Sequence, residues 1–173
     1  MRLRRLFFPA AILIFFFLAS PPQVGSHERP AQKPQPSAAQ AQDREGIAAL
    51  QKRDIAASMT LDVDALIDLW TDDGVLLPPH HEPIEGKAAL RHFLEQYRNQ
   101  YRNHDILAYN EEWKEVMVIG EYAYQWGTIS SRMKPPTGAE IETAVHAVRI
   151  LKREKDGYWR VARAIWNEAP TGK

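Results

Sequence analysis

The segment that most constrains the fold of this chain is DGYWRVARAIWN at residues 156–167. An Asp-Gly turn signal opens the segment, and the residues from Tyr158 to Asn167 contain no Gly or Pro. Large side chains occupy both alternating faces of this run, which is typical of a long strand that is covered on both sides. The sequence therefore predicts a sheet whose last strand ends the folded domain.

The sequence predicts three further strands before this last strand. After Asn103 the spacing of the apolar residues changes from about 3.6 toward 2, which favours strands over helices. The expected strands lie at residues 105–117, 121–133, 140–153 and 158–168. Because the segments between them are short and rich in Gly and Pro, we expect a meander of antiparallel hairpins.

Helical patterns fill the first half of the domain. A first helix is predicted over residues 44–59, and Asp62 is a natural N-cap for a second helix. The apolar face of that second helix consists of Val63, Leu66, Ile67 and Trp70. Residues 71–74 are expected to end it, a short strand follows at 75–77, and a third helix begins after Gly86. The predicted fold is α+β, a cone-shaped, curved antiparallel sheet packed on three N-terminal helices and enclosing a pocket.

The N-terminal part carries the features of an export signal. Three arginines precede an apolar run from Leu6 to Ala19, which is short for a membrane span of about 20 residues but normal for a secretory signal. We expect a signal peptide at 1–26, a flexible linker rich in Pro, Gln and Ala at 27–43, and the domain at 44–173. The protein is then periplasmic or secreted, with no transmembrane segment in the mature chain. The alternative is an uncleaved N-terminal anchor.

Composition narrows the classes of partner. The formal net charge is +0 and no basic stripe stands out, so we expect no nucleic acid partner. The chain has no cysteine, which excludes disulfides. His80, His81 and Glu82 lie together but lack the spacing of a zinc site. We therefore predict no metal site and no cofactor.

Several segments resemble a known superfamily. These are LDVDALIDLWTDDGVLLPP at 61–79, IEGKAA at 84–89, AYQWG at 123–127 and WRVARAIWN at 159–167. Together they are similar to the nuclear transport factor 2-like superfamily, in its SnoaL-like and ketosteroid isomerase-like branch. The resemblance implies the predicted fold, and it also implies a homodimer formed through the open face of the sheet. Ala164 stands where relatives often carry an Asp, so this chain lacks that acid.

Three residues are candidates for proton transfer. His146 lies mid-strand among small and apolar neighbours, which suggests partial burial and a role as general base. Tyr124 is a candidate hydrogen-bond donor to a developing oxyanion. Asp73 is a candidate acid or base, although Asp at such a position is also a common turn former.

Candidates for ligand binding are mostly aromatic, since Trp and Tyr combine an apolar ring with a polar group and suit a half-wet cavity. Arg149, a strand arginine flanked by apolar residues, is a candidate clamp for a carboxylate or phosphate. The alternative is that it pairs across a dimer interface or extends to solvent. The complete predicted set is Trp70, Tyr109, Trp113, Trp126, Arg149, Trp166 and Asn167.

These observations favour an exported domain that binds a small, largely apolar molecule. Two alternatives stay open. One is a cofactor-independent isomerase, cyclase or dehydratase that works by proton transfer. The other is a dimeric module that binds a partner protein at the cell envelope.

Overall fold

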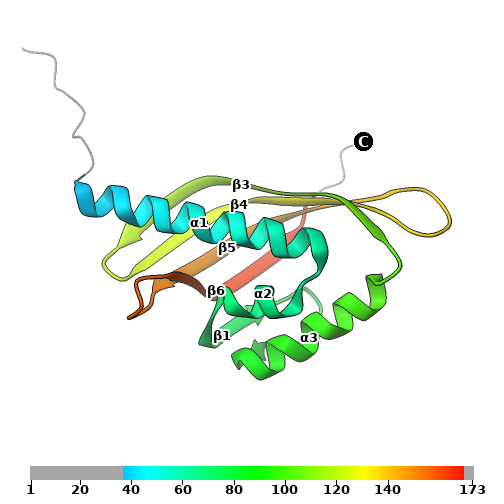
Figure 1. Ribbon diagram of the computed structural model, residues 1–173, viewed down its shortest axis with the longest axis horizontal. Coiled ribbons are helices and arrows are strands. Elements are labelled where there is room, and N and C mark those ends of the chain that lie inside the picture. The colour runs from blue at the N-terminus through cyan, green and yellow to red at the C-terminus, as the bar shows by residue number, and fades with distance from the viewer. Residues whose placement is uncertain (1–36, 170–173) are drawn as a thin grey trace, which may run out of the picture. The chain divides into compact units, whose positions relative to one another are not determined.

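The computed structural model describes residues 37–169 (Figure 1). Three helices come first, interrupted by two strands, and four long strands follow. The elements are α1 (Ala38–Thr60), α2 (Val63–Asp68), β1 (Trp70–Leu77), β2 (Ile84–Glu85), α3 (Gly86–Tyr101), β3 (Asp105–Ile119), β4 (Tyr122–Lys134), β5 (Ile141–Arg153) and β6 (Trp159–Glu168).

All six strands form one sheet in the order β2-β1-β6-β5-β4-β3. The predicted meander of β3 to β6 is confirmed, because each of these strands pairs antiparallel with the next. β1 differs from the predicted antiparallel arrangement, since it pairs parallel with β6. The sheet is therefore mixed, and the three helices pack on it (Figure 1).

The first helix is longer than predicted. It begins at Ala38 rather than Arg44, because Ser37 and Gln40 form a reciprocal capping box. This Ser-x-x-Gln pattern is a sequence signal for the start of a helix, and it lies within the stretch that was predicted to be linker. Residues 38–43 are therefore helical and do not belong to a flexible linker. The predicted signal peptide and the rest of the linker lie outside the described residues.

The predicted boundary between the second helix and the first strand was wrong. Trp70, assigned to the helical face, is the first residue of β1, and the residues from Thr71 to Gly74 continue this strand. The pairing of β1 with β6 is irregular between Trp70 and Val75, so a bulge accommodates the two acidic residues there. The predicted N-cap is confirmed, since the Asp62 side chain accepts a hydrogen bond from Ala65 N.

The core joins the helices to the inner face of the sheet. Leu90 of α3 and Leu151 of β5 are fully buried, and Trp159 of β6 is 2% exposed. α1 approaches Trp159 closely at Gly46, where an added Cβ would lie 2.7 Å from the indole Cδ1. This packing holds α1 against the sheet, and it places the polar residues of α1 over the strands.

Within residues 37–169, no helix is both long and apolar enough to cross a membrane.

Candidate functional site

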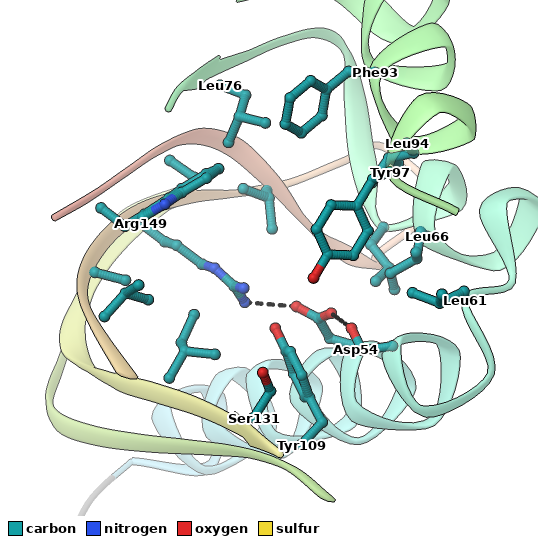
Figure 2. Close-up of a pocket in the computed structure, with 18 of the residues that line it drawn as sticks. Asp54, Leu61, Leu66, Leu76, Phe93, Leu94, Tyr97, Tyr109, Ser131 and Arg149 are labelled. Atoms are coloured by element: carbon teal, nitrogen blue, oxygen red, sulfur yellow. Dashed lines mark hydrogen bonds and ion pairs between the residues drawn. The ribbon is translucent and has the colours of Figure 1, made fainter. Parts of the chain in front are cut away.

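A pocket of about 310 Å³ lies between the helices and the inner face of the sheet (Figure 2). Its walls are mainly apolar and come from α2, α3 and all the long strands. The apolar lining consists of Leu61, Leu66, Leu69, Trp70, Leu76, Phe93, Leu94, Ile106, Ile129, Met133, Val145, Ala147, Val161, Ala164, Ile165 and Trp166. A cavity with these walls suits an apolar molecule.

Polar groups gather on one side of this pocket. Asp54 and Ser58 lie one turn apart on α1, and the Ser58 hydroxyl donates a 3.1 Å hydrogen bond to Asp54 Oδ1. Figure 2 shows Tyr97 from α3 and Tyr109 from β3 pointing toward the same region as Asp54. The apolar pocket thus has one polar end, built by elements that are far apart in the sequence.

Arg149 of β5 occupies the centre of this polar end. Its Nη1 lies 2.7 Å from Asp54 Oδ2 and 2.9 Å from Glu111 Oε1. The guanidinium carbon lies 5.0 Å from the ring centroid of Trp113, which also donates a 3.1 Å hydrogen bond from Nε1 to Glu111 Oε2. We call Asp54, Arg149 and Glu111 the buried triad, because their side chains are almost wholly removed from solvent.

Two acids share one guanidinium in the buried triad, and burial there changes the pKa of Glu111 and of its neighbours Tyr109 and Arg149. Burial raises the pKa of Glu111 to about 8, although Arg149 acts in the opposite direction. Burial also raises the pKa of Tyr109, and the nearby charge of Asp54 adds to that effect. For Arg149 burial lowers the pKa, but the two carboxylates outweigh it and the net shift is upward. Near neutral pH the triad therefore favours the protonated form of Glu111.

A row of hydroxyl groups continues the polar end across the sheet. Tyr109 of β3 pairs with Ser131 of β4, and Ser131 pairs in turn with Thr143 of β5. The Ser131 and Thr143 hydroxyl oxygens lie 2.7 Å apart. All three residues line the pocket. Together with Asp54, the row offers a ligand both hydrogen-bond donors and acceptors.

A family model of the SnoaL-like domain matches residues 44–163. The chain belongs to this family. A comparison with curated proteins finds no match. Solved structures give the same fold, which is nuclear transport factor 2-like with ketosteroid isomerase-like neighbours.

Three of these structures illustrate the similarity of the SnoaL-like domain. A ketosteroid isomerase-like protein from Erwinia carotovora atroseptica is 24% identical, with a TM-score of 0.60, and the match covers 73% of this chain and 96% of that one. An NTF2-like protein with a cystatin-like fold from Novosphingobium aromaticivorans is 21% identical, with a TM-score of 0.62 and coverages of 76% and 85%. A protein from Catenulispora acidiphila, in complex with S-DNPA, is 17% identical, with a TM-score of 0.62 and coverages of 75% and 95%.

Four of the predicted ligand-binding residues line the pocket of this SnoaL-like domain. They are Trp70, Tyr109, Arg149 and Trp166. The Arg149 guanidinium is already paired with two carboxylates of its own chain. Arg149 therefore lines the site but is not free to bind an anionic group of a ligand. Trp113 lies behind this wall and lines a second cavity, on the other side of the buried triad.

The other predicted site residues do not line the pocket. Trp126 and Asn167 are exposed on the opposite face of the sheet. His146 is exposed rather than partly buried, with Nδ1 3.3 Å from the Thr128 hydroxyl. Strand parity explains this, because His146 alternates with the inward Ala147.

Tyr124 and Asp73 are also outside the pocket. Tyr124 alternates on β4 with the buried Ala123 and Gln125, so its side chain leaves the sheet on the outer face. Asp73 is exposed in the bulge of β1, with Oδ2 3.8 Å from Arg163 Nη2. The neighbouring Thr71 hydroxyl lowers the pKa of Asp73, which suits an ionised surface acid. The structure thus does not bring the three predicted catalytic residues together.

Sequence reasoning missed the acids of the triad. On α1 the buried positions include Ile47, Leu50, Asp54, Ala57 and Ser58. These positions repeat with the period of a helix. The polar residues Asp54 and Ser58 within this otherwise apolar stripe could have indicated a site from the sequence. Glu111 gave no such signal, since it lies in an acidic run that looks solvated.

Bulges in β3 hid the parity of Glu111 as well. The pairing of β3 with β4 shifts between Ile106 and Ala108, and again between Trp113 and Glu115. At the second shift β3 passes very close to Gly127, where an added Cβ would lie 2.1 Å from the Glu112 carbonyl oxygen.

Among residues 37–169, no group of three or more His, Cys, Asp or Glu side chains is arranged to hold a metal ion.

Proposed function

We propose that this SnoaL-like domain binds a small, largely apolar molecule that carries a single oxygen-bearing polar group. The observation that supports this most directly is the combination of apolar walls with one polar end, where Asp54, Tyr109 and Ser131 meet. Apolar walls supply most of the affinity, and a few placed polar groups fix the orientation of the ligand. That another protein of this fold is in complex with a small molecule is consistent with the proposal.

A thermal-shift screen tests the proposal. The probes are flat polycyclic and terpenoid ketones or alcohols, each paired with its parent hydrocarbon. A ligand present at about 100 times its Kd stabilises a protein by about 2.7 kcal/mol, which such a screen detects. We expect the oxygenated probes to bind more tightly than the hydrocarbons, because the polar end otherwise loses contacts with water that the ligand does not replace.

Matched tyrosine variants locate the ligand. Tyr109→Phe removes a hydroxyl from the polar end, and we expect Kd to rise about 5- to 10-fold, as is typical of one lost hydrogen bond. Tyr124→Phe on the outer face is the control and should leave Kd unchanged. Equal effects of the two variants, or no binding by any probe, would contradict the proposal.

A second candidate function is proton transfer on the bound molecule, without a cofactor. It rests on one observation, that the carboxylate of Asp54 lines the pocket beside the hydroxyl-bearing residues Tyr109 and Ser58. A carboxylate so placed acts as a general base when a substrate C–H lies within reach. In this case Asp54→Asn abolishes turnover while a bound probe is retained, and His146→Gln leaves turnover unchanged.

We further propose that the protein is a homodimer outside the cytoplasm. Apolar side chains cluster on the outer face of the sheet, where Trp126 of β4 pairs with Val148 of β5 and Ile150 lies two residues further along β5. All three are exposed. A contiguous apolar face of this kind is typical of a protein interface.

Export through residues 1–26 is tested by cell fractionation, with the mature N-terminus expected at His27.

Substitution of Val148 tests the dimer. Val148→Lys places two charges close together across a twofold interface, and we expect the dimer Kd to rise at least about 10-fold. Tyr158→Lys changes an exposed aromatic residue in the turn before β6 and serves as the control. Analytical ultracentrifugation measures both. A wild-type monomer at high concentration would argue against this interface.

A further inference from the structure

Asp54 brings a charged hydrogen-bond acceptor to the wall of the pocket. Its side chain is 8% exposed, and its Oδ2 lies 2.7 Å from Arg149 Nη1. Asp54 is thus a counterion of Arg149, and an ionised carboxylate has no proton to donate. The group at the centre of the polar end therefore only accepts hydrogen bonds.

The neighbours of Asp54 leave part of its acceptor capacity unused. Ser58 donates to Oδ1 over 3.1 Å, and Arg149 lies against Oδ2. A carboxylate has about four lone-pair sites on its two oxygens, so Asp54 can also accept from a ligand. Because the Ser58 proton is already used in the bond to Asp54, Ser58 offers a ligand only lone pairs. This side of the polar end favours a ligand that donates.

Two tyrosine hydroxyls supply the complementary donors. Tyr97 and Tyr109 point toward Asp54 from α3 and β3, and neither hydroxyl is hydrogen-bonded to another of the pocket residues drawn in Figure 2. Burial raises the pKa of both hydroxyls, so both keep their protons near neutral pH. Each of them is therefore available to donate to an oxygen atom of a ligand.

A ligand oxygen between these groups faces a donor on one side and a carboxylate on the other. A hydroxyl satisfies both, because it accepts from a tyrosine and donates to Asp54. A ketone oxygen satisfies only the tyrosine, and its lone pairs then face the carboxylate. A carboxylate ligand would add a second negative charge beside Asp54, while Arg149 is already paired with two acids.

The apolar surroundings increase this difference. Leu61, Leu66 and Leu94 line the pocket near Asp54 (Figure 2). A hydrogen bond to a charged group is stronger in such surroundings, and a carboxylate that loses contact with water there without a replacement is destabilised. The hydroxyls of Ser131 and Thr143 are neutral and lie 2.7 Å from each other, so they discriminate less between ligands.

We propose that the polar group of the pocket ligand is a hydroxyl, which donates a hydrogen bond to Asp54 and accepts one from Tyr97 or Tyr109. The pocket then selects an alcohol or a phenol over the corresponding ketone. This inference rests on the proposed function, and it narrows the oxygen-bearing group of the ligand to one chemical class.

Three probes with one carbon skeleton separate this inference from the proposed function. They are 1-tetralol, 1-tetralone and tetralin, titrated into the purified protein by isothermal titration calorimetry. We expect the alcohol to bind at least about 10-fold more tightly than the ketone, as is typical of one hydrogen bond to a charged group. Equal binding of alcohol and ketone, both tighter than tetralin, would overturn the inference and leave the proposed function standing. Equal binding of all three probes, or binding of none, would overturn both.

Substitution of Asp54 tests the assigned acceptor. The amide in Asp54→Asn donates as well as accepts, so the preference for 1-tetralol over 1-tetralone should fall at least about 5-fold. Tyr109→Phe is the matched control, because a tyrosine donates to both probes, and it should weaken both by similar factors and leave their ratio unchanged. A preference that survives Asp54→Asn, or that is lost in Tyr109→Phe, would refute the role of Asp54. If Asp54→Asn does not fold, the ratios in the wild type and in Tyr109→Phe decide.

Discussion

Replacing Arg149 with Met is expected to lower the free energy of unfolding by about 3–5 kcal/mol, the usual cost of removing one partner from a buried ion pair. Asp54 Oδ2 and Glu111 Oε1 lie 2.7 Å and 2.9 Å from the guanidinium, and both side chains are buried. Met keeps much of the aliphatic volume but leaves the charge of Asp54 without compensation. Urea denaturation near neutral pH measures the loss.

A second substitution separates the charge effect from lost packing. Asp54→Asn in the Arg149→Met background removes the uncompensated charge, so the double variant should be more stable than Arg149→Met alone. Arg132→Met is the surface control, because Arg132 Nε lies 3.7 Å from Glu140 Oε2 and both residues are largely exposed. Its cost should stay below about 1 kcal/mol. Similar losses in Arg149→Met and Arg132→Met would show that the triad does not stabilise the fold.

Glu111→Gln is expected to change how stability depends on pH. Burial raises the pKa of Glu111 from 4.5 to about 8. Between these values the unfolded chain releases this proton and the folded chain keeps it, so wild-type stability falls as pH rises from about 4.5 to about 8. Gln resembles the protonated acid and has no such loss. The variant should therefore gain on the wild type with rising pH, by at least about 1 kcal/mol between pH 5 and pH 9.

The neighbouring acid provides the control. Glu112 is exposed and paired with Lys114, so Glu112→Gln should give a difference from wild type that varies little over the same pH range. Chemical denaturation of the three proteins at each pH supplies the comparison, in which titrations common to all of them cancel. A Glu111→Gln variant that loses stability relative to wild type on going to high pH would show that Glu111 is already ionised near neutrality.

Much of the sheet was predictable from local pattern. Period-2 alternation and Gly-rich turns placed β3 to β6 within a few residues, because each strand is long and its signal repeats many times. β1 was harder to predict. Its pairing partner β6 lies far along the chain, and the acidic residues of its bulge read as a helix stop. Local propensity could not show that tertiary pairing draws Trp70 and Thr71 into the sheet.

The candidate site was only partly predictable, for a related reason. Aromatic content and the family resemblance pointed to a pocket, and Tyr109, Arg149 and Trp166 do line it. His146 and Trp126 were misplaced because strand parity cannot be assigned without knowing which face is buried. A shift of one residue moves every side chain of a strand to the other face.

The sequence by itself determined the order of the elements, the N-cap at Asp62, the family and the aromatic character of the domain, since these depend on spacings of a few residues. The tertiary structure alone decided the site. The packing of α1 on β3 and β5 brings Asp54, Glu111 and Arg149 into contact. The spacing of these three residues along the chain does not indicate this contact. The bulge between Ile106 and Ala108 then turns Glu111 inward, because one extra residue reverses the alternation that a strand otherwise keeps.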